Sequence, residues 1–437
     1  MERKLYKYLL EWKENNINMP LMVIGARQVG KTYTIKEFCE NEFKNYVYIN
    51  LFEEENIVEM FKQKISITEK IQLLKIMIKN TKKIDIDFEK TPIFFDEIQE
   101  SEEIISTLKY FNESEIPYKI LCAGSLLGVK LNRMKKAFPV GKVDMVNMYP
   151  MDFEEFLIES MGKEIIEIIK EHYHNNEPII DTMHNELISL YRLYLCTGGM
   201  PASVVNILSN NKDILKYNSN ILKNIIKGYL ADMKKYVKDS TETVRITNIY
   251  NSVPSQIGNK SNKFQYSKVR SGARSKNYET ALQWLLASKL VHKICLLKSV
   301  QIPPEVYKDD EIFKLFLSDV GILMSLLNIN YEEIILDKKI IYKGDIAENY
   351  VLQQLNINFE HIYYWKNSNT AEVDFIINNK DGLIPIEVKA SNNTQSKSLN
   401  IYINQFKPKY AIRISTKNFG FANGIKSIPL YATFCIK

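Results

Sequence analysis

The sequence predicts an α/β protein of several domains, and three observations carry this prediction. The apolar run Leu21–Ile24 is a short strand that leads directly into a glycine-containing loop and a helix. A second apolar run, Thr91–Phe95, ends in Asp96 and Glu97, and a strand–turn–strand pattern covers residues 371–389. At 437 residues the chain is long enough for two to four domains, each with its own hydrophobic core.

The segment after the first strand, Gly25-Ala-Arg-Gln-Val-Gly-Lys-Thr32, has the GxxxxGKT spacing of a phosphate-binding P-loop. Its two glycines let the backbone turn around a phosphate, and the helix that begins near Lys31 adds the positive end of its dipole. Lys31 can reach the β- and γ-phosphates, and the Thr32 hydroxyl can bind Mg²⁺. A plain glycine turn is the alternative, which the strand and helix context disfavours. The predicted nucleotide-binding residues are Gly25, Ala26, Gln28, Val29, Gly30, Lys31, Thr32 and Tyr33.

The strand that ends in Asp96 and Glu97 has the form of a Walker B segment. Asp96 would hold Mg²⁺, and Glu97 would polarise the water that attacks the γ-phosphate. A single helix is expected over residues 52–78, and a further strand over 118–124. That strand is followed by Ser125, a candidate contact for the γ-phosphate or the attacking water, with a helix N-cap as the alternative role. The pairing of both motifs predicts ATP hydrolysis and not nucleotide binding alone.

Three further strings join these motifs: AGSLL, FPVGKVDMVNMYPMDFEEFL and YLCTGGMPASV. Over essentially its whole length the chain resembles AAA-type ATPases of bacteria and archaea, which carry a C-terminal domain of unknown function with a PD-(D/E)XK nuclease-like fold. The resemblance implies a P-loop ATPase core with a parallel sheet over 1–160 and a helical lid over 161–205. A basic winged-helix-like domain over 206–333 and an α/β restriction-endonuclease-like domain over 334–437 would follow.

One position departs from the family pattern. Family members often carry Gly-Arg where this chain has Gly141-Lys142, and a lysine offers a phosphate a point charge where an arginine offers a bidentate fork. Hydrolysis would then be slower, or the arginine role would fall to Arg27 or Arg133. AAA-type ATPases often complete their site with an arginine from a neighbouring subunit, so the resemblance leaves a homo-oligomer open without assigning that arginine.

Positive charge is concentrated in the middle of the chain. Residues 206–300 contain 17 lysines and arginines against 5 acids, a net charge of +12, whereas the whole chain carries +6. Residues 247–297 follow the helix, turn, helix and wing order of a winged helix, and Phe264 and Tyr266 lie among the basic residues. We expect this region to bind DNA, through phosphates first, the alternatives being a solvated lysine-rich surface or a protein-docking winged helix. The basic residues of the acid-free segment 259–277 are Lys260, Lys263, Lys268, Arg270, Arg274 and Lys276.

The C-terminal strands carry a D…ExK pattern. Glu387 and Lys389 are two residues apart and share one face of a strand, and Asp374 lies on the preceding hairpin strand where it can face them. Carboxylates from two strands can hold Mg²⁺ or Mn²⁺, and the lysine can lower the pKa of a bound water. The likeness to PD-(D/E)XK nucleases adds Glu348, from the preceding helix, as a further metal ligand. The alternative is an exposed, salt-bridged strand edge.

Composition narrows the class of protein. The five cysteines are scattered and never form a CxxC pair, which argues against a disulfide framework and a zinc site. No apolar run approaches the roughly 18 residues that a membrane span requires, and the N-terminus lacks the apolar stretch of a signal peptide. We therefore expect a cytoplasmic protein.

Two functions are compatible with these patterns. The first is ATP hydrolysis with Mg²⁺, coupled to DNA binding and to metal-dependent DNA cleavage by the C-terminal core. The second is an ATP-dependent regulatory protein that binds DNA or a protein partner and whose nuclease-like domain is inactive.

Overall fold

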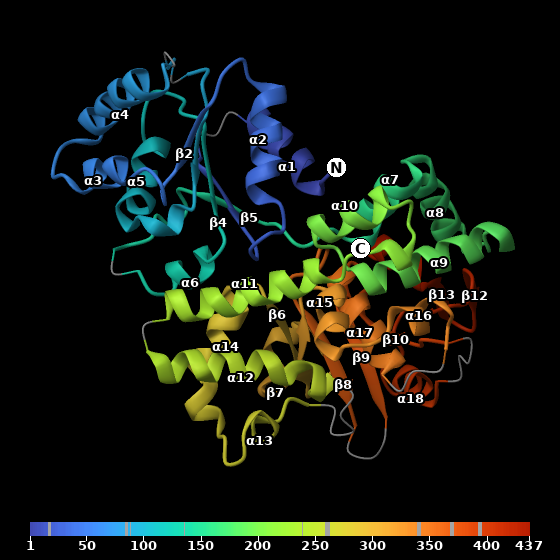
Figure 1. Ribbon diagram of the computed structural model, residues 1–437. Coiled ribbons are helices and arrows are strands. Elements are labelled where there is room, and N and C mark those ends of the chain that lie inside the picture. Colours follow the sequence, from blue (N-terminus) through green and yellow to red (C-terminus); the bar gives the residue numbers. More distant parts are fainter. Residues whose placement is uncertain are drawn as a thin grey trace. The chain divides into compact units, whose positions relative to one another are not determined.

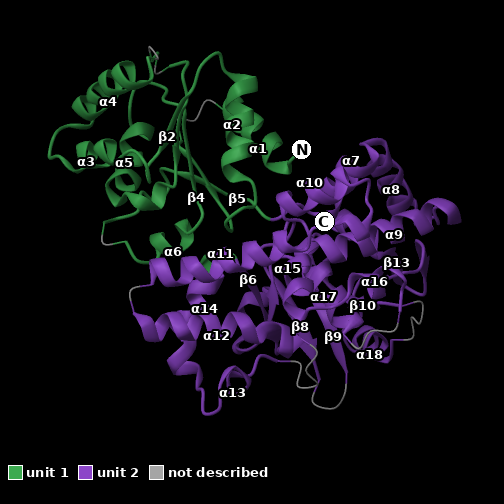
Figure 2. Ribbon diagram, in the orientation of Figure 1, with its two compact units in different colours: residues 1–149, 287–289 green, residues 150–286, 290–437 purple. Residues whose placement is uncertain are grey.

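The computed structural model divides into two compact units (Figure 2): residues 1–149 with 287–289, and residues 150–286 with 290–437. The predicted boundaries at 205/206 and 333/334 fall inside the second unit. The structure describes residues 1–15, 19–83, 86–87, 89–134, 136–237, 239–257, 263–338, 342–367, 371–391 and 396–437.

The first unit is built on a five-stranded parallel sheet with the strand order β2-β3-β4-β1-β5 (Figure 1). β4 lies between β1, which precedes the P-loop, and β3, which ends in Asp96, as the sequence predicts for an ATPase with an additional strand between its two motifs. The carboxyl ends of parallel strands meet at one edge, so the two motifs and Ser125 are brought to the same edge. The strands are β1 (Leu21–Ile24), β2 (Val47–Asn50), β3 (Ile93–Asp96), β4 (Ile120–Gly124) and β5 (Asp144–Asn147).

Helices cover the sheet of the first unit. Apolar side chains of α3, α4 and α5 pack on one face, where they form a continuous core with β2, β3 and β4. The single helix expected over 52–78 is wrong: the chain breaks into α3 and α4 because Ser66 begins a new helix. The Ser66 hydroxyl accepts the Glu69 N–H and the Glu69 carboxylate accepts the Ser66 N–H. The helices are α1 (Lys4–Glu14), α2 (Lys31–Glu42), α3 (Glu55–Lys62), α4 (Ile67–Lys82), α5 (Glu102–Asn112) and α6 (Leu127–Leu131), with the short 3₁₀ turn η1 (Ile98–Glu100).

The second unit contains an eight-stranded mixed sheet with the order β12-β13-β11-β10-β9-β8-β6-β7. The hairpin β6–β7 lies where the sequence places a wing, and the parallel pairing of β6 with β8 makes it one edge of this larger sheet. β9 and β10 form the predicted antiparallel hairpin. The strands are β6 (Val291–Leu297), β7 (Lys308–Leu317), β8 (Ile362–Lys366), β9 (Glu372–Asn379), β10 (Gly382–Val388), β11 (Ala411–Ser415), β12 (Gly420–Ala422) and β13 (Ile425–Pro429).

The helices of the second unit surround this sheet (Figure 1). Tyr402 of α18 packs on Trp365 and on Val373 of β9, and Tyr350 of α17 packs on Tyr194 of α9. No helix in the described ranges has both the length and the apolar character needed to cross a bilayer. The helices are α7 (Phe153–Met161), α8 (Glu164–Asn175), α9 (Asp181–Thr197), α10 (Pro201–Ser209), α11 (Asn220–Tyr236), α12 (Ser240–Ile257), α13 (Tyr266–Val269), α14 (Ser275–Ala287), α15 (Val320–Leu327), α16 (Tyr331–Ile335), α17 (Lys343–Leu355) and α18 (Lys397–Phe406).

Two of the strings that carry the family resemblance pack against each other in the second unit. Asp152 caps α7 in a capping box with Glu155. The Met151 N–H donates to the Gly199 carbonyl at 2.7 Å, and a Cβ on residue 199 would collide with the Met151 carbonyl oxygen. Gly199 of one string is therefore required by close backbone approach to the other.

Candidate functional site

The P-loop connects β1 to α2 in the first unit. Gly30 takes the N-cap position of α2 with φ 100°, and Gln28 also has a positive φ of 67°. A Cβ on Gly25 would collide with the Met148 carbonyl oxygen, so both glycines of the motif answer a steric demand. The Lys31 ammonium donates to the carbonyl oxygens of Gly25 and Ala26, at 2.8 Å each. The lysine thus lies folded over its own loop.

Burial dominates the electrostatics of Lys31. The side chain is 7% exposed, and the loss of water lowers its pKa to about 8. The carboxylates of Glu97 and Asp96 act in the opposite direction and limit this fall. The ammonium is therefore poised to gain from a phosphate, because an anion in contact with it would favour its charged form.

Asp96 at the end of β3 binds directly to the P-loop helix. The Thr32 hydroxyl donates to Asp96 Oδ2 at 2.9 Å, and the Tyr48 hydroxyl donates to the same oxygen at 3.1 Å. The Glu97 N–H donates to Asp96 Oδ1 at 3.0 Å. Burial raises the pKa of Asp96, and the neighbouring charge of Glu97 adds to the rise. A hydroxyl beside a carboxylate is a donor set that suits Mg²⁺ when phosphate oxygens and waters complete the shell.

Glu97 lies beside Asp96 in the left-handed region, with φ 51°. Its Oε2 accepts a hydrogen bond from the Gln99 amide and one from the Ser125 hydroxyl, the latter at 3.5 Å. Leu126 and not Ser125 occupies the N-cap of α6. Ser125 therefore faces the acidic residue of the site and does not cap the helix that follows it.

The remaining P-loop residues divide into buried and exposed ones. Ala26 and Val29 are buried, so only their backbones can face a ligand, whereas Tyr33 is 59% exposed. Lys142 forms an ion pair with Glu113, its Nζ lying 3.3 Å from the carboxylate. Arg27 and Arg133 are both exposed.

Three residues of this site escape sequence reasoning. Arg3 is buried, and its guanidinium donates to the carbonyl oxygens of Val29 at 2.6 Å and of Tyr149 at 2.7 Å. These two hydrogen bonds connect the P-loop to the backbone at Tyr149. Tyr48 and Gln99 hold Asp96 and Glu97, respectively. Arg3 lies 26 residues from Val29 and 146 from Tyr149, and Tyr48 lies 48 residues from Asp96. Gln99 lies two residues after Glu97. These separations follow no common spacing, so no motif predicts the contacts.

The basic segment of the second unit lies on α13 and the start of α14. The aromatic residues predicted to lie among these bases pack on other rings: Phe264 is buried and stacks on Phe313, and Tyr266, which is half-buried, meets Phe264 edge to face. Positive charge is therefore the main exposed feature of the segment. Lys260 lies outside the described residues. The exposed bases of the segment are Lys263, Lys268, Arg270, Arg274 and Lys276.

The D…ExK residues come together on one face of the eight-stranded sheet. Lys389 Nζ donates to Glu387 Oε1 at 2.6 Å, and the Val388 N–H donates to Asp374 Oδ2 at 2.7 Å. Glu387 is 4% exposed, and its Oε2 is buried without a hydrogen-bond partner among the described residues. Glu348 of α17 lies near both Asp374 and Glu387: its charge acts on Asp374, and the charge of Glu387 acts on it.

Two charged residues that the sequence pattern omits, Lys314 and Glu372, lie beside these side chains. We call Glu348, Glu372, Asp374 and Glu387 the carboxylate cluster. Lys314 Nζ of β7 lies 2.6 Å from Glu372 Oε1 and 3.7 Å from Glu348 Oε2. Lys314 is flanked on both sides by apolar residues of β7, and Glu372 begins β9, so neither has a spacing that links it to the motif.

Burial and mutual repulsion govern the pKa values in the cluster. Burial raises the pKa of Glu348 to about 7, with Asp345, Glu372 and Glu387 adding to the rise and Lys314 opposing it. Burial also raises the pKa of Asp374, and the charges of Glu348 and Glu387 add to it. Within the described part of the chain, no three His, Cys, Asp or Glu side chains are arranged to hold a metal ion. The predicted ligands Glu348, Asp374 and Glu387 are thus neighbours without forming such a site.

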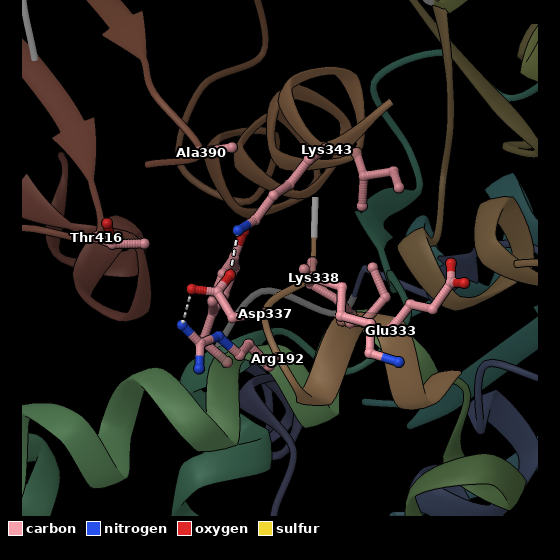
Figure 3. Close-up of a pocket in the computed structure, with 11 residues that line it drawn as sticks. Arg192, Glu333, Asp337, Lys338, Lys343, Ala390 and Thr416 are labelled. Atoms are coloured by element: carbon pink, nitrogen blue, oxygen red, sulfur yellow. Dashed lines mark hydrogen bonds and ion pairs between the residues drawn. The ribbon is translucent and has the colours of Figure 1, made fainter. Parts of the chain in front are cut away.

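A small pocket lies at the beginning of α17, the helix that carries Glu348 (Figure 3). Arg192 of α9 forms an ion pair with Asp337 at 2.8 Å, and Lys343 at the first position of α17 bonds to the other oxygen of the same carboxylate. Ala390, next to Lys389, lines the opposite wall. The Arg192–Asp337–Lys343 ion pairs connect α9 to α17.

Three family profiles match consecutive parts of the chain. Residues 18–157 match the AAA domain, residues 188–333 a domain of unknown function (DUF8612), and residues 343–433 another domain of unknown function (DUF4143). The first match lies on the residues that form the parallel sheet and the P-loop, and both agree with an AAA-type P-loop fold. The nuclease-like character of the C-terminal part is named by none of them.

An uncharacterized protein of Methanocaldococcus jannaschii is 27% identical over 231 residues, which is 52% of this chain. The match spans 43% of that protein, less than half of its length. The Walker-type ATPase of Pyrococcus abyssi is a structural relative with 17% identity and a TM-score of 0.44, covering 75% of this chain and 95% of its own. The ORC2 protein of Aeropyrum pernix, in ADPNP–ADP complexes, has 11% identity and a TM-score of 0.39, covering 76% and 92%. Scores of this size support no inference about what the chain does.

Proposed function

We propose that the chain is a Mg²⁺-dependent ATPase that couples its nucleotide cycle to a bound polyanion, DNA. The observation that carries the ATPase is the convergence of Thr32, Asp96, Glu97 and Ser125 at the carboxyl edge of the parallel sheet. These side chains supply a metal-binding hydroxyl, a metal-binding carboxylate, a general base and a polar contact within one hydrogen-bonded group. A nucleotide-binding module without turnover needs neither the base nor its orienting partners.

The residues of the site take separate roles in this proposal. The P-loop amides and the N-terminus of α2 bind the phosphates, and Lys31 exchanges the carbonyls of Gly25 and Ala26 for phosphate oxygens. Thr32 and Asp96 would hold Mg²⁺, which would supply positive charge at the phosphates. Glu97, oriented by Gln99 and Ser125, accepts a proton from the attacking water.

Phosphate release by the purified full-length chain tests the ATPase. Lys31→Ala and Glu97→Gln are expected to abolish release, and Lys142→Ala is expected to leave it within about twofold, because Lys142 is engaged with Glu113. Undetectable turnover by the wild-type protein with ATP and Mg²⁺, with nucleotide binding intact, would contradict the proposal.

Exposed positive charge supports DNA as the polyanion. The five described bases of the 263–276 stretch are exposed, and the only acid between residues 259 and 279 is Glu279. Since Phe264 is buried and Tyr266 is half-buried against it, this surface offers contact mainly through phosphates. We therefore expect binding with little sequence preference and a strong dependence on salt.

The DNA proposal is tested by fluorescence anisotropy with a duplex at several salt concentrations. Reversing two exposed charges, Lys268→Glu with Arg270→Glu, should weaken binding and reduce the slope of log K against log salt by roughly 2. Reversing two exposed lysines elsewhere, Lys44→Glu with Lys366→Glu, is the matched control and should leave the slope unchanged. Equal effects of the two pairs would refute a DNA surface at α13.

The second candidate function differs in what the C-terminal core does. In the first candidate Asp374, Glu387 and Lys389 cleave DNA with Mg²⁺ or Mn²⁺. Glu387 Oε2 favours this candidate, because it is buried without a hydrogen-bond partner among the described residues and would be a metal ligand. In the second the core is an inactive scaffold of an ATP-dependent regulatory protein, which the lysine inside the cluster favours. Incubation with supercoiled DNA in each metal separates them: cleavage lost in Lys389→Ala supports the first, and no cleavage alongside ATP turnover supports the second.

A further inference from the structure

We infer that Lys314 is the built-in counter-cation of the carboxylate cluster, so that Glu348 serves as its ion-pair partner and not as a ligand of a divalent metal. The inference concerns the second unit alone and does not depend on the ATPase proposed for the first. It replaces the metal-ligand role that the sequence pattern suggests for Glu348 and confines any cation to the Asp374–Glu387 side.

The first step of the argument is the position of the ammonium. Lys314 Nζ lies between two carboxylates, 2.6 Å from Glu372 Oε1 and 3.7 Å from Glu348 Oε2. The Lys314 and Glu372 side chains are 13% and 12% exposed, so water contributes little to their charge balance. The ring of Tyr364 lies 5.1 Å from the same ammonium and closes another side. A divalent cation bound to Glu348 would have to share this small space with a fixed positive charge.

The second step is that the two halves of the cluster are satisfied differently. On one side Glu348 and Glu372 meet Lys314. On the other side Glu387 meets Lys389 and Asp374 accepts the Val388 N–H, which leaves Glu387 Oε2 as an acceptor without a partner among the described residues. This second half therefore contains a buried carboxylate oxygen that lacks a hydrogen-bond partner among the described residues and that a bound cation would satisfy.

The third step is that the chain holds Lys314 in place through backbone contacts. Asn349, next to Glu348 on α17, accepts the Leu317 N–H at 2.9 Å and donates to the Leu317 carbonyl at 3.1 Å. This double hydrogen bond joins α17 to the edge strand β7, three residues beyond Lys314. The meeting of Glu348 with Lys314 is therefore fixed by the packing of a helix on a strand and not by two flexible side chains.

The test is Mn²⁺ binding, followed by the electron paramagnetic resonance signal of free Mn²⁺ without nucleotide. All proteins carry Asp96→Asn, which removes the metal-binding carboxylate of the first unit. Relative to this parent, Glu348→Gln should leave Mn²⁺ affinity unchanged. Lys314→Met should raise affinity about tenfold or more, because a fixed positive charge a few ångströms away has been removed. That gain should vanish when Glu348→Gln is added.

Two results would overturn the inference: a loss of Mn²⁺ affinity of about tenfold in Glu348→Gln, or no gain in a folded Lys314→Met protein. Circular dichroism checks folding, and Lys314→Arg, which keeps the charge, should bind Mn²⁺ as the parent does. If Lys314→Met does not fold, Glu348→Gln alone decides, since its affinity either falls or stays. None of these readouts uses DNA cleavage.

Discussion

At the scale of single residues, the proposed ATPase site is a network of hydrogen bonds that fixes its acidic groups. Asp96 holds Thr32 and Tyr48 on one oxygen and the Glu97 N–H on the other. Glu97 is in turn held by Gln99 and Ser125. Such preorganisation would keep Glu97, the general base of the proposed mechanism, in the geometry that proton transfer requires.

The first prediction concerns Glu97 and its partners. Glu97→Gln should lower the rate of phosphate release by about 10²–10⁴-fold, the typical contribution of a general base. Ser125→Ala should lower it less, because Gln99 still holds the carboxylate. Single-turnover phosphate release measures both, and binding of a fluorescent ATP analogue is the control. A Glu97→Gln protein with normal turnover would remove Glu97 from the proposed mechanism.

The second prediction follows from the pKa of Lys31, which burial lowers to about 8. A phosphate beside the ammonium favours its charged form, so the pKa of Lys31 rises when nucleotide binds. Binding therefore takes up a proton above pH 8, and ATP affinity should fall as the pH rises from 8 to 9.5, while it stays level between pH 7 and 8. Calorimetric titration at each pH measures this, and Lys31→Met should flatten the profile. A flat wild-type profile above pH 8 would contradict the prediction.

At the scale of elements, one buried carboxylate joins three segments of the second unit. Asp319 caps α15 by accepting the Ile322 N–H, and its other oxygen accepts the Gly199 N–H at 2.7 Å and the Gln353 amide at 3.3 Å. The loop before α10, the helix α15 and the helix α17 therefore share a single acceptor. Burial raises the pKa of Asp319 to about 6.

The third prediction is that Asp319→Asn destabilises the second unit by about 1–3 kcal/mol, since an amide cannot accept all three bonds and leaves a buried donor unsatisfied. The raised pKa of Asp319 means that the folded wild-type protein binds the extra proton between roughly pH 3.8 and 6. Its stability should therefore fall as the pH rises through this window, a component that the variant lacks. Denaturant unfolding measures both, with the half-exposed cap Asp213→Asn as the matched control. Equal effects of the two substitutions would refute the special role of Asp319.

At the scale of the whole molecule, the two sets of chemical groups belong to different compact units. The P-loop and the Walker B residues lie in the first, and the basic segment and the carboxylate cluster lie in the second. Each unit has its own sheet and its own core, so a substitution that preserves folding in one unit need not disturb the other.

The fourth prediction is that single substitutions separate ATP turnover from the functions of the second unit. Asp374→Asn should leave basal ATP turnover, measured without DNA, within about twofold of wild type, because its contacts lie entirely in the second unit. Lys31→Ala should abolish turnover yet leave nucleotide-free DNA binding unchanged. Phosphate release and anisotropy on both variants provide the measurement. Loss of both activities in either folded variant would show that the units act as one.

The sequence by itself determined the features that depend on local spacing. The P-loop, the strand that ends in Asp96 and Glu97, and the hairpin with Asp374, Glu387 and Lys389 each lie within a short segment whose period and glycines dictate one conformation. Parallel strands place their carboxyl ends at one edge, which brings Ser125 to Glu97, but the full order of the strands was not predicted from the sequence.

Only the tertiary structure decided the contacts between segments that are distant in sequence. Arg3 contacts the P-loop and Lys314 contacts the carboxylate cluster. Arg3 precedes an ordinary helix and Lys314 lies in an ordinary strand, so neither local pattern indicates the contact. Phe264 and Tyr266 look like base-stacking residues beside lysines, but packing on Phe313 buries or covers them. Burial and charge balance are properties of the assembled core, since a side chain's partners are set by the packing of whole elements and not by its neighbours in the chain.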